Sequence, residues 1–246
     1  MKYQEGRPLR KVYMGRFIGR CVTLVIGVLA YFFWQDQFAV LPGMAFFERL
    51  SLLHLIWCIW VADMLMQLIP LRVLVPLGSQ KLFAQRFRST EKADVQEALR
   101  AYTKDQNHRA LWIAAVWGCL IAAIGVLYGM EIIDGNMLLL ITVAFYVCDL
   151  ICVLFWCPFR VFFLRNRCCT TCRIFNWDHL MMFSPLIFLK SFYAWSLILL
   201  SVLVVVVWEV EVYRHPERFW EGTNQNLKCG ACTDKLCLRY SKISRK

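Results

Sequence analysis

Five apolar runs are the feature of this sequence that most restricts its fold, because each is about as long as a membrane-spanning helix. A helix that crosses the hydrocarbon core of a bilayer needs about 20 consecutive residues that are mostly apolar. No cleavage site of small residues, which a secretory signal would need, follows the first run. A 59% share of hydrophobic residues also exceeds that of ordinary soluble domains. The sequence therefore predicts an all-α, polytopic membrane protein with about five transmembrane helices in a single membrane domain (1–246), at Phe17 to Trp34, Leu50 to Leu71, Ala110 to Met130, Met137 to Trp156 and Leu180 to Trp208.

The positions of Lys and Arg predict the topology. Six precede or open the first run, eight lie between Arg72 and Arg109, and four lie between Arg160 and Arg173, whereas segments 35–49 and 131–136 hold one and none. Cytoplasmic loops are enriched in these residues, so the N-terminus is predicted to be cytoplasmic, and five crossings make the tail 209–246 extracytoplasmic. The eight Lys or Arg of this tail favour an even number of crossings instead, but the 29 residues of the last run are too few for two full crossings.

Segment 73–109 is the largest one predicted on the cytoplasmic side. Leu82, Phe83 and Phe87 among basic residues predict a short amphipathic helix on the membrane surface, and a second helix is predicted after the possible N-cap at Ser89 and Thr90. The basic residues that give the chain its net charge of +11 lie in such segments between the runs, which favours anionic lipid as a partner over nucleic acid.

Two cysteine-rich segments outside the apolar runs predict thiolate metal sites. Each contains a Cys-x-x-Cys pair, a spacing that lets two thiolates bind one ion, as in zinc and iron–sulfur sites. One further cysteine lies near each pair. The candidate ligands are Cys168, Cys169, Cys172, Cys229, Cys232 and Cys237.

Whether the two pairs share one ion depends on the topology. With five spans they face opposite compartments, and each pair needs its own fourth ligand. The nearby candidates are His179 or Asp178 for the first pair and His215 for the second. In an oxidising compartment, the tail could instead form a disulfide between Cys229 and Cys232 or Cys237. The glutamates that surround His215 are expected to be solvated.

The remaining cysteines lie in or beside the apolar runs, where a thiol behaves as a small hydrophobe. Cys148 and Cys152 are an exception, since they lie one helical turn apart and could act as a dithiol. The others are Cys21, Cys58, Cys119 and Cys157.

Three charged residues within the runs are candidates for a functional site, because a charge inside the membrane costs about 2.5–3.5 kcal/mol on insertion scales. These are Asp63, Asp149 and Lys190, all expected between the midplane and the inner face. Lys190 is predicted to pair with one of the aspartates. Such a pair could lock two helices together or belong to a path for protons or substrate.

The sequence contains no common hydrolase or nucleotide-binding motif and assigns no enzymatic activity. The first hypothesis is a membrane protein whose surface metal sites serve electron transfer or thiol redox with a redox partner; iron would make the sites redox centres and zinc would make them structural. A second hypothesis is a carrier or channel for ions or small solutes that uses the three intramembrane charges, although Pro185 is the only helix break of the kind found in transporters. A third is a non-catalytic subunit of a membrane complex, which the Gly-x-x-x-Gly pair at Gly125 and Gly129 would suit.

Overall fold

The computed structural model describes residues 9–34, 42–48, 51–69, 82–90, 95–166 and 172–228. Within these ranges the chain is helical and contains no strand, only two isolated β-bridges. The longer helices are α1 (Leu9–Phe33), α3 (Leu52–Leu68), α4 (Val95–Gly129), α5 (Gly135–Leu154) and α7 (Phe192–Arg214). The short ones are η1 (Ala45–Phe47), η3 (Ala84–Arg86), η4 (Phe159–Leu164), η6 (Phe175–Trp177), α6 (Asp178–Phe183), η7 (Ser184–Phe188), η8 (Pro216–Arg218) and η9 (Gln225–Leu227).

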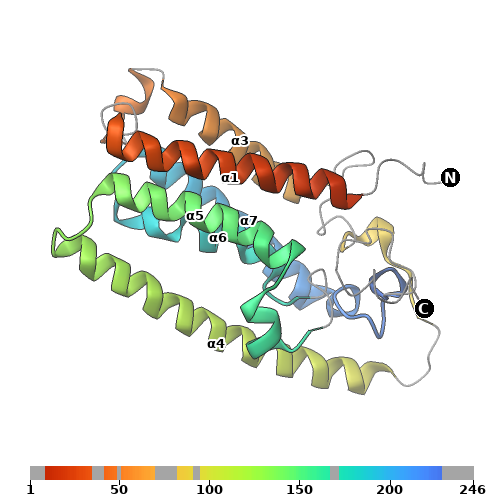
Figure 1. Ribbon diagram of the computed structural model, residues 1–246. Helices are drawn as coiled ribbons and strands as arrows, with labels where there is room; N and C mark the ends of the chain where they lie inside the picture. The colour runs from red at the N-terminus through yellow and green to blue at the C-terminus, as the bar shows by residue number, and fades with distance from the viewer. Residues whose placement is uncertain are drawn as a thin grey trace.

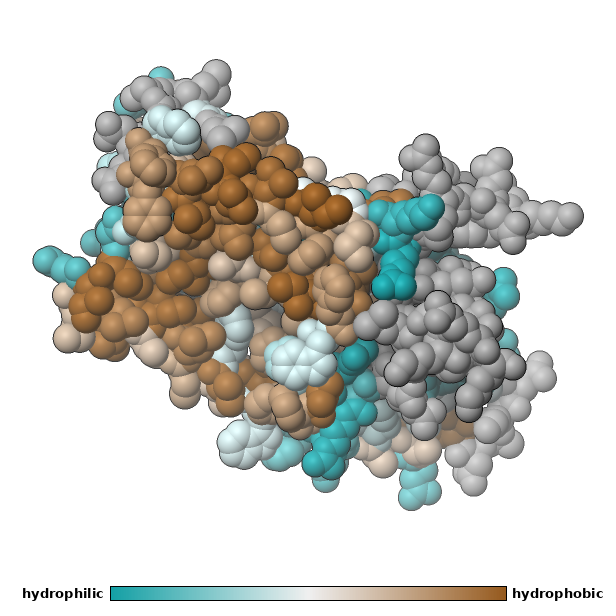
Figure 2. All heavy atoms as spheres, in the orientation of Figure 1, coloured by the Kyte–Doolittle hydropathy of each residue, from teal (hydrophilic) through white to brown (hydrophobic). Residues whose placement is uncertain are grey.

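Four of these helices, α1, α4, α5 and α7, are long and apolar enough to cross a membrane. The apolar helix α3 has 17 residues and rises about 25 Å at 1.5 Å per residue, somewhat less than the hydrocarbon core of a bilayer. Hydrophobic side chains cover most of the visible surface along the bundle (Figure 2). The all-α expectation is thus confirmed for the described residues, and the four apolar helices indicate a membrane-embedded protein.

The helices lie side by side, and their ends meet at two faces of the bundle (Figure 1). We name these the Arg173 end, where α1 and α4 begin and α5 and α7 finish, and the Gly43 end, where α3, α5 and α7 begin. The antiparallel contact between α1 and α5 shows this arrangement. The ring centre of Phe17, in the first half of α1, lies 5.4 Å from that of Phe155, just past the end of α5.

Helix α4 extends farther than the third predicted span. The separate helix expected after Ser89 and the span at Ala110 to Met130 form one helix of 35 residues. The segment before it does not form the predicted amphipathic surface helix in its described part, residues 82–90, where only the three-residue η3 is helical. Leu82 is buried there, and the ring centre of Phe83 lies 5.1 Å from that of Trp208 of α7.

The last apolar run, predicted as one helix from Leu180 to Trp208, is divided into two legs that run in opposite directions. Arg173 and Trp177, just before the first leg, bind Glu209 near the Arg173 end of α7. The first leg, α6 followed by η7, rises about 19 Å toward the Gly43 end and finishes beside α4 and α5. There Phe188 occupies the space beside Gly125, where a Cβ would lie only 2.4 Å from its ring.

Local sequence explains the division. Pro185 has no N–H to donate and clashes with a helical carbonyl, so α6 ends at Phe183 and the chain tightens into η7. Leu189 and Ser191 are extended. Gly43, whose positive φ of 59° suits glycine, donates its N–H to the carbonyl of Lys190 (2.9 Å) and accepts the N–H of Phe192 (2.9 Å). These bonds satisfy backbone groups that the break would leave unpaired.

The described part of the tail therefore lies at the Arg173 end. Gln225 N–H donates to the carbonyl of Arg88 (2.9 Å), Thr90 N–H donates to that of Thr223 (3.0 Å), and Trp220 stacks on Tyr102 of α4 at 5.2 Å. This contradicts, for residues 215–228, the prediction that the tail and segment 73–109 lie on opposite sides. The physical reason is that a short first leg, which needs fewer residues than a full crossing, returns the chain to the Gly43 end before α7 begins.

Side-specific thiol labelling tests this arrangement. We expect Lys228→Cys to be modified by a membrane-impermeant maleimide from the same side as Cys172, and Lys190→Cys from the opposite side, because Lys190 is exposed at the Gly43 end. The measurement is labelling of sealed vesicles of known orientation before and after permeabilisation. Labelling of Lys228→Cys and Lys190→Cys from one side would contradict the two-leg arrangement.

Candidate functional site

A salt bridge inside the bundle joins α1 to α5. The guanidinium of Arg20 donates to Asp149 (2.7 Å) and to the backbone carbonyl of Tyr146 (2.7 Å), and it lies 3.8 Å from the centre of the Tyr146 ring. The two side chains are only 12% and 26% exposed. Arginine suits this position because its planar donors can serve a carboxylate, a carbonyl and an aromatic face together.

A second polar group lies where α3 meets α6. The amide nitrogen of Gln67 lies 2.9 Å from Asp178 Oδ2 and 3.0 Å from His179 Nδ1. His179 Nδ1 is also 3.2 Å from Asp178 Oδ1. Gln67 and His179 are buried, at 4% and 6% exposed. We call Arg20, Asp149, Gln67, Asp178 and His179 together the polar network.

The structure separates the three charges that the sequence singled out. Asp149 belongs to the polar network, and half-buried Asp63 of α3 is near enough to Arg20 and His179 for electrostatic interaction. Lys190 is exposed at the Gly43 end, so its predicted pairing with an aspartate is wrong. The error has a physical cause, since the break at Leu189 to Ser191 moves Lys190 from the interior of a helix to its end.

Sequence reasoning missed Arg20 and Gln67. Arg20 lies three residues into the first apolar run and is one of the basic residues that precede or open the span. Its position between apolar residues was a usable signal, because a long basic side chain there needs either a route to the surface or a buried partner. A lone glutamine near a span end gives no comparable signal.

At the Arg173 end, a charged cluster ties α4 and α7 to the segment before α6. Both carboxylate oxygens of Glu209 accept from Arg173, and one of them also accepts from the indole N–H of Trp177 (2.7 Å). Arg173 Nε donates in addition to Asn107 of α4 (2.7 Å). Glu211 is bound by Arg218 at 2.7 Å. Arginines therefore bind both glutamates, whereas the sequence predicted that these glutamates are solvated.

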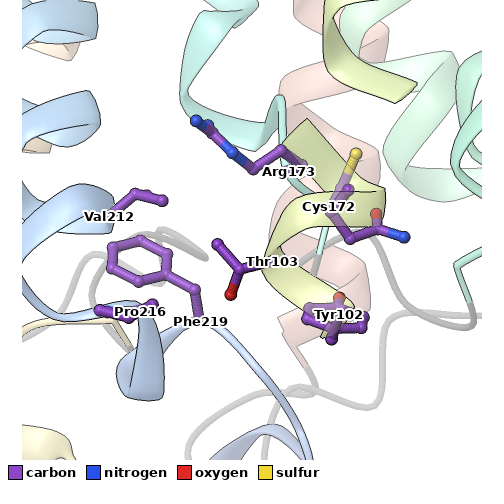
Figure 3. Close-up of a pocket in the computed structure, with 8 residues that line it drawn as sticks. Tyr102, Thr103, Cys172, Arg173, Val212, Pro216 and Phe219 are labelled. Carbon is purple, nitrogen blue, oxygen red and sulfur yellow. The ribbon is translucent and has the colours of Figure 1, made fainter. Parts of the chain in front are cut away.

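Beside this cluster, Cys172 and the tail line one small cavity (Figure 3). Its volume of about 30 Å³ suits a water molecule rather than a solute. Residues far apart in the sequence converge on it, from α4, from the segment before α6, and from α7 and the tail. The lining residues are Tyr102, Thr103, Gln106, Cys172, Arg173, Val212, Pro216 and Phe219.

Most predicted metal ligands, Cys168, Cys169, Cys229, Cys232 and Cys237, lie outside the described residues. The two histidines predicted to complete separate sites have other contacts, His179 in the polar network and His215 with Glu217 Oε1 at 3.1 Å. Among the residues that the structure describes, no group of three or more His, Cys, Asp or Glu side chains is arranged to hold a metal ion.

The cysteines near the end of α5 include a contact, between Cys152 and Cys157, that the sequence did not predict. Cys148 is an exposed free thiol, whereas Cys152 hydrogen-bonds to Cys157. This hydrogen bond from Cys152, together with the backbone N–H groups of Arg160 and Phe159, lowers the pKa of Cys157 to about 6 despite its burial. These contacts favour the thiolate form of Cys157, which the prediction of a small hydrophobe does not include.

Removing one partner of the α1–α5 salt bridge should destabilise the protein more than removing both. We expect Arg20→Met to cost about 3–5 kcal/mol, because it leaves the Asp149 carboxylate buried without its cation, and Arg20→Met with Asp149→Leu to cost clearly less. The measured quantity is the free energy of reversible unfolding in detergent micelles. Lys190→Met is the matched control, with a change within about 0.5 kcal/mol; equal costs for Arg20→Met and Lys190→Met would contradict the assignment.

The Cys157 thiolate predicts an unusual pH profile of alkylation. Only the thiolate reacts, so modification of Cys157 by iodoacetamide should persist through neutral pH and fall as the pH drops through about 6. Mass spectrometry of the modified peptide gives the rate at each pH. Cys152→Ala removes the hydrogen-bond donor and should move the midpoint to higher pH; an unchanged midpoint would show that Cys152 does not stabilise the thiolate.

Comparison with known proteins supplies no family for this arrangement. No protein family model, no curated protein sequence and no solved structure matches the chain. Helical membrane folds host many unrelated functions, so the fold class alone would not decide the function. The side chains at the Arg173 end and in the polar network carry the functional argument.

Proposed function

We propose that this protein is a membrane protein that holds one thiolate metal centre at the Arg173 end, with ligands from both cysteine-rich segments. The four cysteines of the two Cys-x-x-Cys pairs, Cys169, Cys172, Cys229 and Cys232, are the proposed ligands, and Cys168 and Cys237 are their alternates. The centre serves electron transfer or thiol redox if it holds iron, and fastens the loops together if it holds zinc.

A single observation carries this proposal, namely that Cys172 lines the same cavity as Pro216 and Phe219 of the tail. The sequence alone had favoured opposite sides for the two segments, which would exclude a shared ion. With residues 172 and 228 both at the Arg173 end, only short stretches of chain need to reach a common ion. Cys169 precedes Cys172 by three residues, and Cys229 follows Lys228 directly.

Four thiolates suit both metals under consideration. Zinc prefers a closed tetrahedral set of four sulfurs at about 2.3 Å, and iron–sulfur clusters use the same number of cysteines. A shared site also removes the need for the two separate histidine ligands, whose ring nitrogens contact other side chains in the structure.

We also propose that the Arg173 end faces the cytoplasm. In the sequence, Arg49 and Lys190 are the only basic residues of the segments that connect helices at the Gly43 end. The positive-inside rule then favours a cytoplasmic Arg173 end, including the described part of the tail. The basic segments there would contact the anionic lipid headgroups of that leaflet.

The carrier hypothesis keeps one supporting observation, the polar network, because charged groups inside a bundle often line ion pathways. It loses Lys190, which is exposed at the Gly43 end. We therefore rank the carrier behind the metal centre.

Metal analysis of matched variants tests the shared centre. For a single shared ion or cluster, Cys172→Ser and Cys232→Ser should each weaken metal binding by more than the roughly tenfold that the loss of an outer-shell partner costs. Both should also lower the unfolding temperature, since metal binding is coupled to folding. Elemental analysis gives the stoichiometry. The visible spectrum separates iron, which gives charge-transfer bands, from zinc, which gives none.

Two controls make the experiment decisive. Cys58→Ser and Cys119→Ser change thiols that are exposed on α3 and α4, and they should leave the metal content unchanged. If Cys172→Ser and Cys232→Ser each remove half of the metal, there are two sites rather than one. Purified protein without bound metal would refute the proposal and leave the carrier as the leading hypothesis.

A further inference from the structure

The polar network contains two carboxylates, Asp149 and Asp178, but only one permanent cation, Arg20, and a buried charge without a partner is costly. Arg20 neutralises Asp149 in a close pair that also satisfies the guanidinium with the Tyr146 carbonyl. Asp178 and the neighbouring Asp63 have no second arginine or lysine among the contacts described for them. The only other side chain of the network that can become positive is His179, and it does so by binding a proton.

The hydrogen bonds around His179 are incomplete in a way that points to this proton. Gln67 Oε1 and Asp178 Oδ1 are buried and make no hydrogen bond, although Oδ1 lies 3.2 Å from His179 Nδ1. Buried polar atoms of this kind are rare, because each unmade hydrogen bond costs about 1–3 kcal/mol. Gln67 is 96% buried with its amide directed at Asp178 and His179, so the unpaired oxygen belongs to the network.

We propose that Gln67, Asp178 and His179 form a proton-binding site inside the bundle that takes up one proton from water and releases it again. The site is independent of the cysteine-rich segments, and it would remain if no metal were bound. Its ligand is the proton itself, and His179 Nδ1 is the atom that receives it.

Two arrangements of hydrogen bonds describe the site without and with its proton. In the empty state, neutral His179 accepts at Nδ1 from the amide N–H of Gln67, which is 3.0 Å away. In the loaded state, Nδ1 carries the proton and donates it to Asp178 Oδ1, while Gln67 continues to donate to Oδ2. One hydrogen bond is exchanged for another, and the carboxylate gains an adjacent imidazolium.

Groups from each neighbouring element set the charge of this site. Asp63 of α3 and Asp149 of α5 both favour a positive His179, and Arg20 of α1 offsets Asp149. Tyr146 of α5 is occupied by the Arg20 guanidinium above its ring. On α7, Glu209 is bound to Arg173 and Trp177, and the adjoining η6 and η7 contain no titratable side chain. Burial opposes a positive charge on His179, whereas the carboxylates of Asp178, Asp63 and Asp149 favour it.

Nitrogen NMR of histidine-labelled, full-length protein in lipid nanodiscs tests the proposal. We expect the ring nitrogens of His179, assigned with His179→Gln, to change from the neutral to the imidazolium pattern as the pH is lowered from about 9 to about 5. Asp178→Asn should abolish this change and keep His179 neutral, because the imidazolium loses its carboxylate. Asp178→Glu should restore the change.

Asp105→Asn is the matched control, since Asp105 is a half-exposed carboxylate on α4 that pairs with Arg109 away from the network. It should leave the His179 profile as in the wild type. A single charge state of His179 throughout the range in the wild type would overturn the proposal, and so would an unchanged profile in Asp178→Asn. If Asp178→Asn does not fold, the wild-type titration and Asp178→Glu still decide.

Discussion

The arrangement of this bundle depends on how the chain reverses at Leu189 to Ser191 without leaving backbone groups unpaired. Within or near lipid, an N–H or C=O that lacks a partner costs several kcal/mol, so a break between two helices needs donors and acceptors from elsewhere. Gly43 supplies both, through its bonds with Lys190 and Phe192. A loop between α1 and α3 thereby makes the reversal between η7 and α7 possible.

This reversal determines what meets at the Arg173 end. Because α7 begins at the Gly43 end, its C-terminal part and the tail return to the segment that carries Cys172, and Glu209 meets Arg173 there. The same reversal positions α6 so that Asp178 and His179 face Gln67 of α3. One change of chain direction thus assembles both the proposed metal centre and the proposed proton site.

The two ion pairs of the polar network have different characters. Arg20 and Asp149 form a closed pair in which Arg20 also donates to the carbonyl of Tyr146, so the pair is suited to fixing α1 on α5. Asp178 and His179 are less completely satisfied, since Asp178 Oδ1 is buried without a hydrogen bond, and a proton on His179 would supply a donor to it. A fully satisfied pair stabilises the fold, whereas an incomplete one is available for function.

The sequence by itself determined the all-α class, the apolar helices and the distribution of basic residues, because these follow from local hydropathy and helix length. It also identified Asp149, since a carboxylate in an apolar run needs a partner whatever the fold. It could not choose that partner: Lys190 and Arg20 were both present, and helix packing brought Arg20 to Asp149. Only the tertiary structure decided that the last apolar run makes two legs, because short helices of mixed type have no distinct hydrophobic period. The side of the tail, and with it the meeting of Cys172 and Phe219, followed from that packing.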